Sequence, residues 1–472
     1  MRRILHLFTS LMIVYSLTGC SVSKQIGKQA NTILLKDSAI STGHIGICIY
    51  EPATNKYWYE NDATHYFIPA SNTKLFTLYA GMKYLGDSLV GLRYQNIADT
   101  AINIFPTGDP TFLHNDFKNQ PVLNFLMAAK KVIFISQNKK SEDENALGYG
   151  WAWDDYNGDY MAERSPMPIA GNTVTLSINK ITHHKFYVDV NWETTPSYFK
   201  KYVDSFYSLS YKWRARRDSD SALASKELQK FSVRRNLGEN IFKTEQATSK
   251  FSKQEIPFYT DKLKTVVAIL QDDYKINIKE GFIADNGLYP EIPSHFKIFS
   301  IHSQLTDSLF KPMMHRSDNF FAEQTLLMAS NEHLGYMNDE KIIDTILKTD
   351  LKDIPQRPKW VDGSGLSRYN LFTPKSFVYI LNKMKNEFGF NRMKNILATG
   401  GEGTISAYFK KDAGFIWAKT GTLSNNCALS GYLITNKGKL LIFSVLANNY
   451  ITGATPVRRA VERFLEGIRE KY

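Results

Sequence analysis

Strands are predicted at both ends of the chain, and this feature restricts the fold more than any other. Near the start, residues 44–50 and 57–59 predict two strands joined by a turn at residues 52–55. Near the end, residues 427–435 and 440–446 predict two further strands. Since both ends supply strands and a helix, we expect the strands to share one antiparallel sheet.

Helices are predicted beside both groups of strands. Apolar residues recur at helical spacing after the first hairpin and again at the end of the chain. The first set is Leu75, Leu78, Met82 and Leu85, and the second is Val457, Val461, Phe464 or Leu465, and Ile468. The two ends therefore predict an α+β fold in which an antiparallel sheet is flanked by helices.

The middle of the chain has a different character. Residues 93–290 mix short strand-like runs, such as Val132–Ile135, with charged loops. We expect residues 41–92 and 291–472 to form one discontinuous domain, and residues 93–290 to form a β-rich insertion of one or two subdomains. The hydrophobic share of 43% is ample for several buried cores in a multidomain chain.

The first residues predict export. Two arginines precede an apolar stretch at residues 4–17, which is too short to span a bilayer and is typical of a secretory signal. The stretch ends in Leu17-Thr18-Gly19-Cys20, the pattern of a bacterial lipobox, so we expect Cys20 to receive lipid. A plain signal peptide with an incidental cysteine is the alternative. Residues 1–19 would then be the signal, residues 20–40 a tether, and the protein periplasmic and lipid-anchored to the inner or outer membrane.

Charge and metal-binding residue types exclude some functions. The net charge of +12 suits an acidic partner, but lysines and arginines are spread along the chain, and the export signal argues against nucleic acid. Cys48 and Cys427 lie in strand-like stretches, and we expect buried free thiols rather than a disulfide. The adjacent His183 and His184 lack a partner pair at metal-ligand spacing, so we expect no metal and no other cofactor.

Three short motifs occur in order along the chain. They are Ser71-x-x-Lys74, Ser317-Asp318-Asn319 and Lys419-Thr420-Gly421. The first motif alone is weak because Ser-x-x-Lys also begins at other serines, and the second alone could be a helix cap. The context of the motifs makes a functional role more credible than chance, since Ser71 opens the first predicted helix and Lys419 ends a predicted strand. The trio in this order is typical of penicillin-binding proteins and β-lactamases.

The first and third motifs suit nucleophilic catalysis. On a helix, residues three apart share a face, so the Ser71 hydroxyl and the Lys74 amine can meet. A serine becomes a nucleophile when a base takes its proton, and Lys74 can be that base if burial and a neighbouring cation, Lys419, lower its pKa. The backbone N–H groups of Ser71 and Thr422 would form an oxyanion hole.

The remaining motif residues suit proton transfer and substrate binding. Ser317 can relay a proton to the leaving amine, and Asn319 can hydrogen-bond a substrate amide. The strand residues Thr420, Gly421 and Thr422, together with Lys419, are expected to bind the substrate and its terminal carboxylate. We therefore expect Ser71, Lys74, Ser317 and Lys419 to be catalytic.

With these motifs identified, the chain resembles the class C low-molecular-mass penicillin-binding proteins, the D-alanyl-D-alanine carboxypeptidase/endopeptidase family. Residues 67–77 are similar to the family's nucleophile segment, and residues 311–324 to its second motif helix. Residues 362–370 and 401–404 are similar to two family hallmarks. The long gap between the first two motifs is also typical of this family, which inserts extra domains there.

The resemblance implies a transpeptidase domain like that of penicillin-binding proteins and β-lactamases, interrupted by the β-rich insertion. It implies a serine-type hydrolase that cleaves D-alanyl-D-alanine peptides of peptidoglycan through an acyl-enzyme at Ser71, with β-lactams as covalent inhibitors. Residues 108–111 and 150–155 resemble parts of the family's insertion. Asp155 matches an acidic residue that faces the amino end of the substrate side chain, and an ordinary surface aspartate is the alternative.

Other functions remain open at this stage. An exported serine esterase or β-lactamase-like hydrolase would keep the same nucleophile, and a non-catalytic cell-wall scaffold would not use it. The full insertion argues against the first alternative, and the presence of all four predicted catalytic residues argues against the second. The sequence leaves undecided whether the enzyme removes terminal D-alanine or cleaves cross-links, which membrane holds it, and its oligomeric state.

Overall fold

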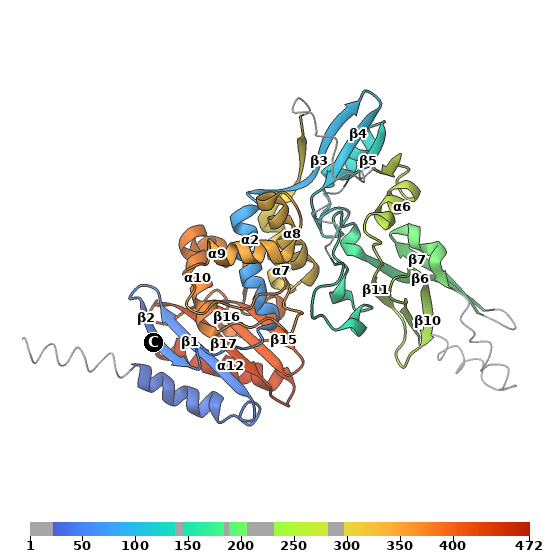
Figure 1. The fold of residues 1–472 in the computed structure, drawn as a ribbon. Helices are drawn as coiled ribbons and strands as arrows, with labels where there is room; N and C mark the ends of the chain where they lie inside the picture. Colours follow the sequence, from blue (N-terminus) through green and yellow to red (C-terminus); the bar gives the residue numbers. More distant parts are fainter. Residues whose placement is uncertain (1–21, 137–144, 184–187, 205–230, 282–296) are drawn as a thin grey trace, which may run out of the picture. The chain divides into compact units, whose positions relative to one another are not determined.

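The computed structural model describes residues 22–136, 145–183, 188–204, 231–281 and 297–472, arranged in two compact units (Figure 1). Unit 1 comprises Met1–Lys83, Phe310–Ala322 and Asp339–Tyr472, and unit 2 comprises Tyr84–Leu309 and Glu323–Asn338. The division falls within three helices, α2 (Lys74–Tyr84), α7 (Thr306–His315) and α8 (Asn319–Leu334). The division expected from the sequence, with an insertion at residues 93–290, stays a prediction.

Unit 1 is built on a six-stranded antiparallel sheet with the order β14-β15-β16-β17-β1-β2. The first strand of the chain pairs directly with the last, His44 lying opposite Asn448 and Tyr50 opposite Ile442. The two ends of the chain therefore share one sheet, as their patterns predicted. The strands are β1 (His44–Glu51), β2 (Lys56–Asn61), β14 (Ala398–Thr399), β15 (Ile416–Leu423), β16 (Asn426–Ile434) and β17 (Leu440–Asn448).

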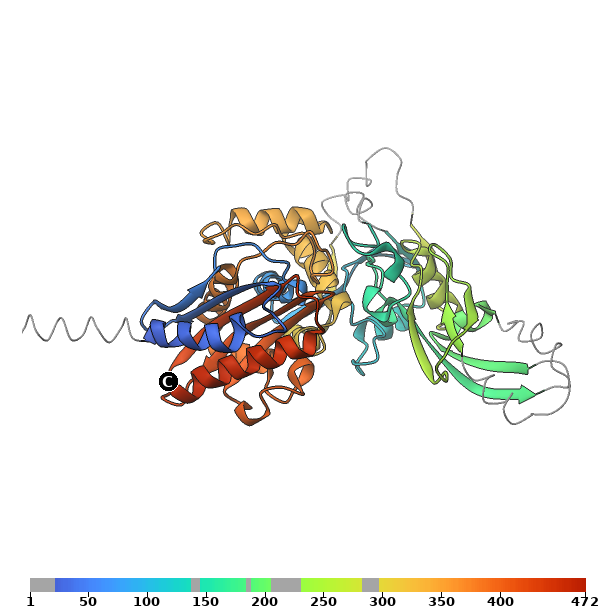
Figure 2. The ribbon, with the colours of Figure 1, turned by 90° about the horizontal axis from the view of Figure 1, so that it is seen from below.

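Helices cover both faces of this sheet (Figure 2). Along β16, Leu433 joins the core beneath α12, whereas the neighbouring Tyr432 donates a hydrogen bond to the Leu381 carbonyl of α10 at 2.7 Å. This alternation follows from the two-residue period of a strand, and it buries the central strands on both sides. The helices are α9 (Asp339–Lys348), α10 (Pro374–Phe388), α11 (Phe390–Ile396) and α12 (Ala454–Lys471), with shorter 3-10 turns η2 (Ala70–Thr73), η8 (Gly403–Ile405) and η9 (Lys410–Asp412).

The segment predicted to be a tether is ordered from residue 22 onward. Residues 22–30 are helical and continue into a short π-helical turn, η1 (Asn31–Leu35), which packs beside α12 (Figure 2). Ile26, Ala30 and Leu34 are fully buried in the core that α12 also covers. The tether prediction is therefore wrong for residues 22–40, because these apolar residues recur at helical spacing and bury one face.

Unit 2 contains three small sheets. The largest has five strands in the order β12-β5-β4-β3-β13, in which β5 runs parallel to both of its neighbours. Its strands are β3 (Ser88–Ala98), β4 (Ala101–Pro106), β5 (Val132–Ile135), β12 (Ile278–Glu280) and β13 (Phe299–Leu305). Two three-stranded sheets contain β6 (Thr173–His183), β7 (Val188–Thr195) and β11 (Lys253–Pro257), and β8 (Val203–Asp204), β9 (Phe231–Arg234) and β10 (Phe242–Gln246). The helices of this unit include α3 (Pro121–Ala128) and α6 (Lys264–Asp272), with 3-10 turns η4 (Trp153–Asp155), η5 (Asp159–Met161), η6 (Ala170–Asn172) and η7 (Ser197–Tyr202).

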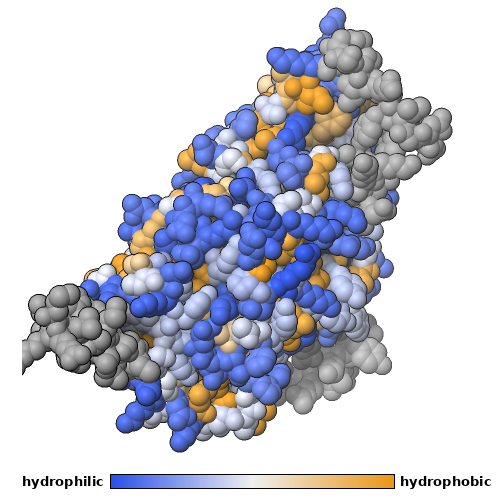
Figure 3. Space-filling model, turned by 60° about the vertical axis from the view of Figure 1, so that its left-hand side comes forward, coloured by the Kyte–Doolittle hydropathy of each residue, from blue (hydrophilic) through white to orange (hydrophobic). Residues whose placement is uncertain are grey.

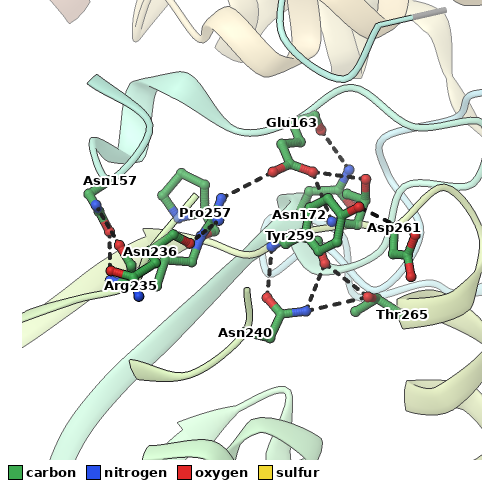
Figure 4. A network of polar contacts seen from close by, with 11 residues as sticks. Asn157, Glu163, Asn172, Arg235, Asn236, Asn240, Pro257, Tyr259, Asp261 and Thr265 are labelled. Carbon is green, nitrogen blue, oxygen red and sulfur yellow. Dashed lines mark hydrogen bonds and ion pairs between the residues drawn. The ribbon is translucent and has the colours of Figure 1, made fainter. Parts of the chain in front are cut away.

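A buried ion pair joins the loops of unit 2 (Figure 4). The guanidinium of Arg235 lies 3.1 Å from a Glu163 carboxylate oxygen, and the two side chains are 0% and 3% exposed. The other Glu163 oxygen accepts hydrogen bonds from the backbone and hydroxyl of Thr260, at 2.8 and 2.9 Å. Arg235 also donates to the Pro257 carbonyl at 2.6 Å. Both charges of this cluster have partners, as buried charges require.

In the ranges given above, none of the helices combines the length and hydropathy that crossing a membrane requires. On the face seen in Figure 3, hydrophilic side chains predominate and hydrophobic ones are scattered among them.

Candidate active site

Ser71 is presented by a tight turn in unit 1. It lies in η2, which runs directly into α2, so the regular helix begins at Lys74 rather than at the serine itself. Asn448 of β17 fixes the chain just before this turn, because its side chain pairs with both backbone groups of Ile68, at 2.7 and 3.1 Å. Ala70 has a left-handed backbone with φ of 48°, a strained conformation of the kind found at functional sites.

Strand β15 passes close to this turn. A Cβ atom on Gly421 would lie 2.5 Å from the Pro69 carbonyl oxygen and 3.1 Å from the Ser71 nitrogen. Only glycine fits such an approach, which explains the third residue of the Lys419-Thr420-Gly421 motif. The structure therefore brings the backbone of the first and third motifs side by side.

Lys74 lies at the centre of the site and is fully buried. Its Nζ is 3.0 Å from the Ser71 Oγ, 2.6 Å from the Asn319 Oδ1 and 2.7 Å from the Ser364 carbonyl oxygen. Three segments far apart in the sequence thus meet on one amine. Two of these oxygens only accept hydrogen bonds, and the Ser71 hydroxyl is the one that can also donate.

The second motif combines a helix cap with two side chains that contact the lysines. Asp318 caps α8 by accepting the Phe321 backbone N–H at 3.0 Å. On either side of it, Ser317 accepts a hydrogen bond from Lys419, and Asn319 accepts one from Lys74. Ser317 has a left-handed φ of 63°, which is unusual for a serine. The cap interpretation therefore holds for Asp318, and its two neighbours belong to the cluster.

Lys419 projects from β15 and is also fully buried. Its Nζ is 2.7 Å from the Ser317 Oγ and 2.7 Å from the Thr420 carbonyl oxygen. Burial holds the pKa of Lys419 well below its usual value, and the positive charges of Lys74 and Arg458 lower it further. The site therefore contains two buried lysines that disfavour each other's charge.

The segment that resembled a family hallmark at residues 362–370 supplies the Ser364 carbonyl. The fully buried Asp362 carboxylate accepts hydrogen bonds from the backbones of Gly365 and Ser367 and from the Asn370 side chain, at 2.7 to 2.8 Å. Gly365 has φ of 83°, and a Cβ there would lie 1.9 Å from the Ala70 carbonyl oxygen. Sequence reasoning assigned no role to this loop, although its resemblance to a hallmark was the available signal.

The second hallmark, at residues 401–404, also reaches β15. The Thr420 hydroxyl donates a hydrogen bond to the Thr404 hydroxyl at 2.7 Å. Thr422 is exposed at the end of the strand, where its hydroxyl contacts the Arg458 guanidinium of α12. Sequence reasoning missed Arg458, since nothing in the pattern of α12 distinguishes it from the other arginines of that helix.

The remaining predicted residues lie elsewhere. Asp155 belongs to unit 2, where it ends η4 and is a hydrogen-bond partner of Tyr160, so its role stays a prediction. Cys20 lies outside the described residues. Cys48 and Cys427 are buried free thiols, as predicted. Among the described residues, no group of histidine, cysteine and carboxylate side chains has a geometry that could hold a metal ion.

Comparison with known proteins identifies a family that matches most of the chain and relatives that match all or part of it. A family model described as the D-Ala-D-Ala carboxypeptidase 3 (S13) family matches residues 28–468. The D-alanyl-D-alanine carboxypeptidase DacB of Haemophilus influenzae is 29% identical over 179 residues, which cover 35% of this chain and 36% of that protein. A D-alanyl-D-alanine carboxypeptidase of Actinomadura sp. is 22% identical over 466 residues, covering 90% of this chain and 81% of that protein. The matches to the first three curated relatives span only about a third of their lengths, 36%, 37% and 33%.

Solved structures show the same fold. The crystal structure of penicillin binding protein 4 from Haemophilus influenzae has a TM-score of 0.70 and 18% identity, covering 94% of this chain and 99% of that chain. The same protein complexed with a β-lactam has a TM-score of 0.64 and 17% identity, with the same coverage. The fold class and the family resemblance predicted from the sequence are thereby confirmed. This chain belongs to the D-Ala-D-Ala carboxypeptidase 3 (S13) family.

Proposed function

We propose that this protein is a serine-type D-alanyl-D-alanine carboxypeptidase that acts on peptidoglycan stem peptides through an acyl-enzyme at Ser71. Family membership supports the reaction class, since a family model named for this activity matches residues 28–468. The observation that carries the assignment of Ser71 is the 3.0 Å contact between its hydroxyl and the buried Lys74 amine. Ser308, which also begins a Ser-x-x-Lys pattern, is exposed, and its hydroxyl donates to the Leu305 carbonyl instead.

The surroundings of Lys74 suit a general base. A neutral lysine has two N–H donors and one lone pair. With the Asn319 Oδ1 and the Ser364 carbonyl as acceptors of its N–H groups, a neutral Lys74 can turn its lone pair toward the Ser71 hydroxyl, 3.0 Å away. Lys74 then takes the hydroxyl proton as the Ser71 oxygen attacks the carbonyl carbon of the penultimate D-alanine.

The rest of the cluster stabilises and resolves the tetrahedral intermediate. The backbone N–H groups of Ser71 and Thr422 donate to the oxyanion. As the carbon–nitrogen bond breaks, the terminal D-alanine amine takes a proton from the Ser317 hydroxyl, which regains one from Lys419 at 2.7 Å. Water then attacks the Ser71 ester and gives up one proton to Lys419 through Ser317. The shortened peptide leaves as its ester bond breaks, and Lys74 returns its proton to the Ser71 oxygen.

β-Lactams should acylate the same serine. A solved structure with this fold contains a β-lactam, which supports this assignment. The proposed site assigns no carboxylate as a base for deacylation, so we expect the penicilloyl ester to hydrolyse slowly. We also propose that the protein is exported and anchored through lipid on Cys20, on the basis of the Leu17-Thr18-Gly19-Cys20 pattern.

Labelling with a fluorescent penicillin tests the proposal. The purified protein should form a stable adduct that peptide mass spectrometry maps to Ser71, and it should release D-alanine from purified muropeptides. Ser71→Ala should abolish both results. Ser308→Ala is the matched control, because it alters another Ser-x-x-Lys serine and should leave labelling unchanged. An adduct on a different residue, or rapid turnover of benzylpenicillin, would contradict the proposed function.

A further inference from the structure

The side chain of Arg458 lies at the end of β15. It is half-buried near the start of α12, and its guanidinium contacts the hydroxyl of Thr422, which directly follows Gly421 in the strand. The Nε of Arg458 is buried and has no hydrogen-bond partner among the described residues. The cation therefore lies at the last residue of the Lys419–Thr422 segment, where we expect the substrate to bind.

Neutral groups surround this guanidinium. The ring of Tyr408 has its centroid 5.9 Å from the guanidinium carbon. The Cys427 thiol is also close enough to interact with Arg458, but burial raises the pKa of this thiol, so it stays protonated and uncharged at neutral pH. Neither group supplies a negative charge to the arginine.

The other arginines of α12 all have carboxylate partners. The three ion pairs are Arg459–Glu462 at 2.6 Å, Arg463–Asp37 at 2.9 Å and Arg469–Asp412 at 3.0 Å. Among the described residues, Arg458 is in no such pair, and its guanidinium contacts a neutral hydroxyl instead. A guanidinium without a carboxylate partner in the structure is available to a ligand that carries a negative charge.

The charge of Arg458 adds to that of the two lysines. Its positive charge is one of the causes that lower the pKa of Lys419, after burial and Lys74. Lys419 itself donates hydrogen bonds to Ser317 and to the Thr420 carbonyl. At this end of β15, the Arg458 Nε therefore has no hydrogen-bond partner among the described residues, whereas the Lys419 amine donates to two oxygens.

We propose that Arg458 is a specificity-determining residue that binds, together with Thr422, the carboxylate at the carboxyl end of the substrate. This inference rests on the proposed function and adds a residue to the carboxylate site expected from Lys419, Thr420 and Thr422. A guanidinium can offer two parallel N–H donors to a carboxylate, which a hydroxyl cannot. The alternative is a structural role, in which Arg458 only fastens α12 to β15.

Two peptides that differ only at the carboxyl end separate these roles. The substrates are diacetyl-L-Lys-D-Ala-D-Ala and the same peptide with a C-terminal amide. Arg458→Gln should lower kcat/KM for the acid by about 10- to 100-fold, the range expected for one charged hydrogen bond, and leave that for the amide nearly unchanged. Arg458→Lys should fall between, because it keeps the charge but loses the fork. Arg459→Gln is the matched control on the same helix and should change neither value.

The outcomes distinguish this inference from the proposed function. If the wild-type protein forms the Ser71 adduct and prefers the acid, but Arg458→Gln keeps that preference, this inference alone fails. Equal losses on both peptides, or a fall in melting temperature that Arg458→Lys also shows, would indicate the structural role. If the wild-type protein neither hydrolyses a peptide nor forms the adduct, the proposed function fails and this inference fails with it.

Discussion

Each unit of the molecule buries charged side chains, but the surroundings of the two clusters differ. In unit 2, Arg235 and Glu163 form a 3.1 Å ion pair whose side chains are 0% and 3% exposed. In unit 1, Lys74 and Lys419 are both fully buried, and their hydrogen-bond partners include hydroxyl, amide and carbonyl oxygens.

The difference separates a structural cluster from a reactive one. A buried cation beside a carboxylate is neutralised, so it stabilises the arrangement of the loops that it joins. Two buried lysines in one cluster disfavour each other's charge, which favours loss of a proton from the pair. Such perturbed groups are typical of functional sites. Four substitutions test this comparison.

The largest effect is expected at Lys74. Lys74→Met removes the proposed base, so acylation by penicillin should slow by about 10²- to 10⁴-fold. The melting temperature should change little, because methionine fills much of the same space and avoids the cost of burying an amine. Stopped-flow acylation and thermal unfolding measure the two quantities. Lys83→Met, on the same helix and paired with Asp350 at 3.6 Å, is the control and should acylate normally.

Glu163→Gln should have the opposite effect, a large loss of stability rather than of acylation rate. It leaves Arg235 buried without its carboxylate, which should reduce the free energy of unfolding by about 3–5 kcal/mol. Denaturant unfolding measures this loss. Glu245→Gln is the matched control, since Glu245 and Arg234 form an exposed pair at 3.9 Å whose removal should cost about 0–1 kcal/mol. Equal losses in the two variants would remove the distinction drawn between the clusters.

Asp362→Asn should have a smaller effect on both stability and acylation. The carboxylate that accepts three N–H groups is replaced by an amide that must turn one donor toward them, a loss of about 1–3 kcal/mol. Because this loop delivers the Ser364 carbonyl to Lys74, the pH profile of acylation should shift as well. An unchanged profile in a destabilised protein would show that Asp362 is structural only. Asp353→Asn, at an exposed position, is the control.

Lys419→Met should show the smallest effect on stability, but one that depends on pH. The folded-state pKa of Lys419 is depressed, so between that value and the ordinary value of 10.5 the unfolded chain binds more protons. Wild-type stability therefore rises as the pH increases through this window. The variant lacks this dependence, so its stability relative to wild type should be greatest at low pH and decline toward pH 10.5. Unfolding measured across that range tests the sign, and a constant difference would contradict it.

Much of unit 1 could be predicted from the sequence because its signals are local. The strand periods at residues 44–50 and 440–446 predicted that these strands share one sheet, and the structure pairs them directly as β1 and β17. The tether prediction failed because the burial of Ile26 and Leu34 depends on α12, which lies at the other end of the chain. The regular helix begins at Lys74 and not at Ser71, which lies in the preceding 3-10 turn, and the sequence period did not distinguish the two.

The sequence alone determined the order of the three motifs and the strand and helix periods around them, because both are encoded within a few neighbouring residues. The tertiary structure decided that the Ser364 carbonyl contacts Lys74 and that Arg458 contacts Thr422. These contacts join residues that are far apart along the chain, and one carbonyl or one arginine carries no local pattern that distinguishes it from others. Their partners are set only when the sheet and its helices pack together.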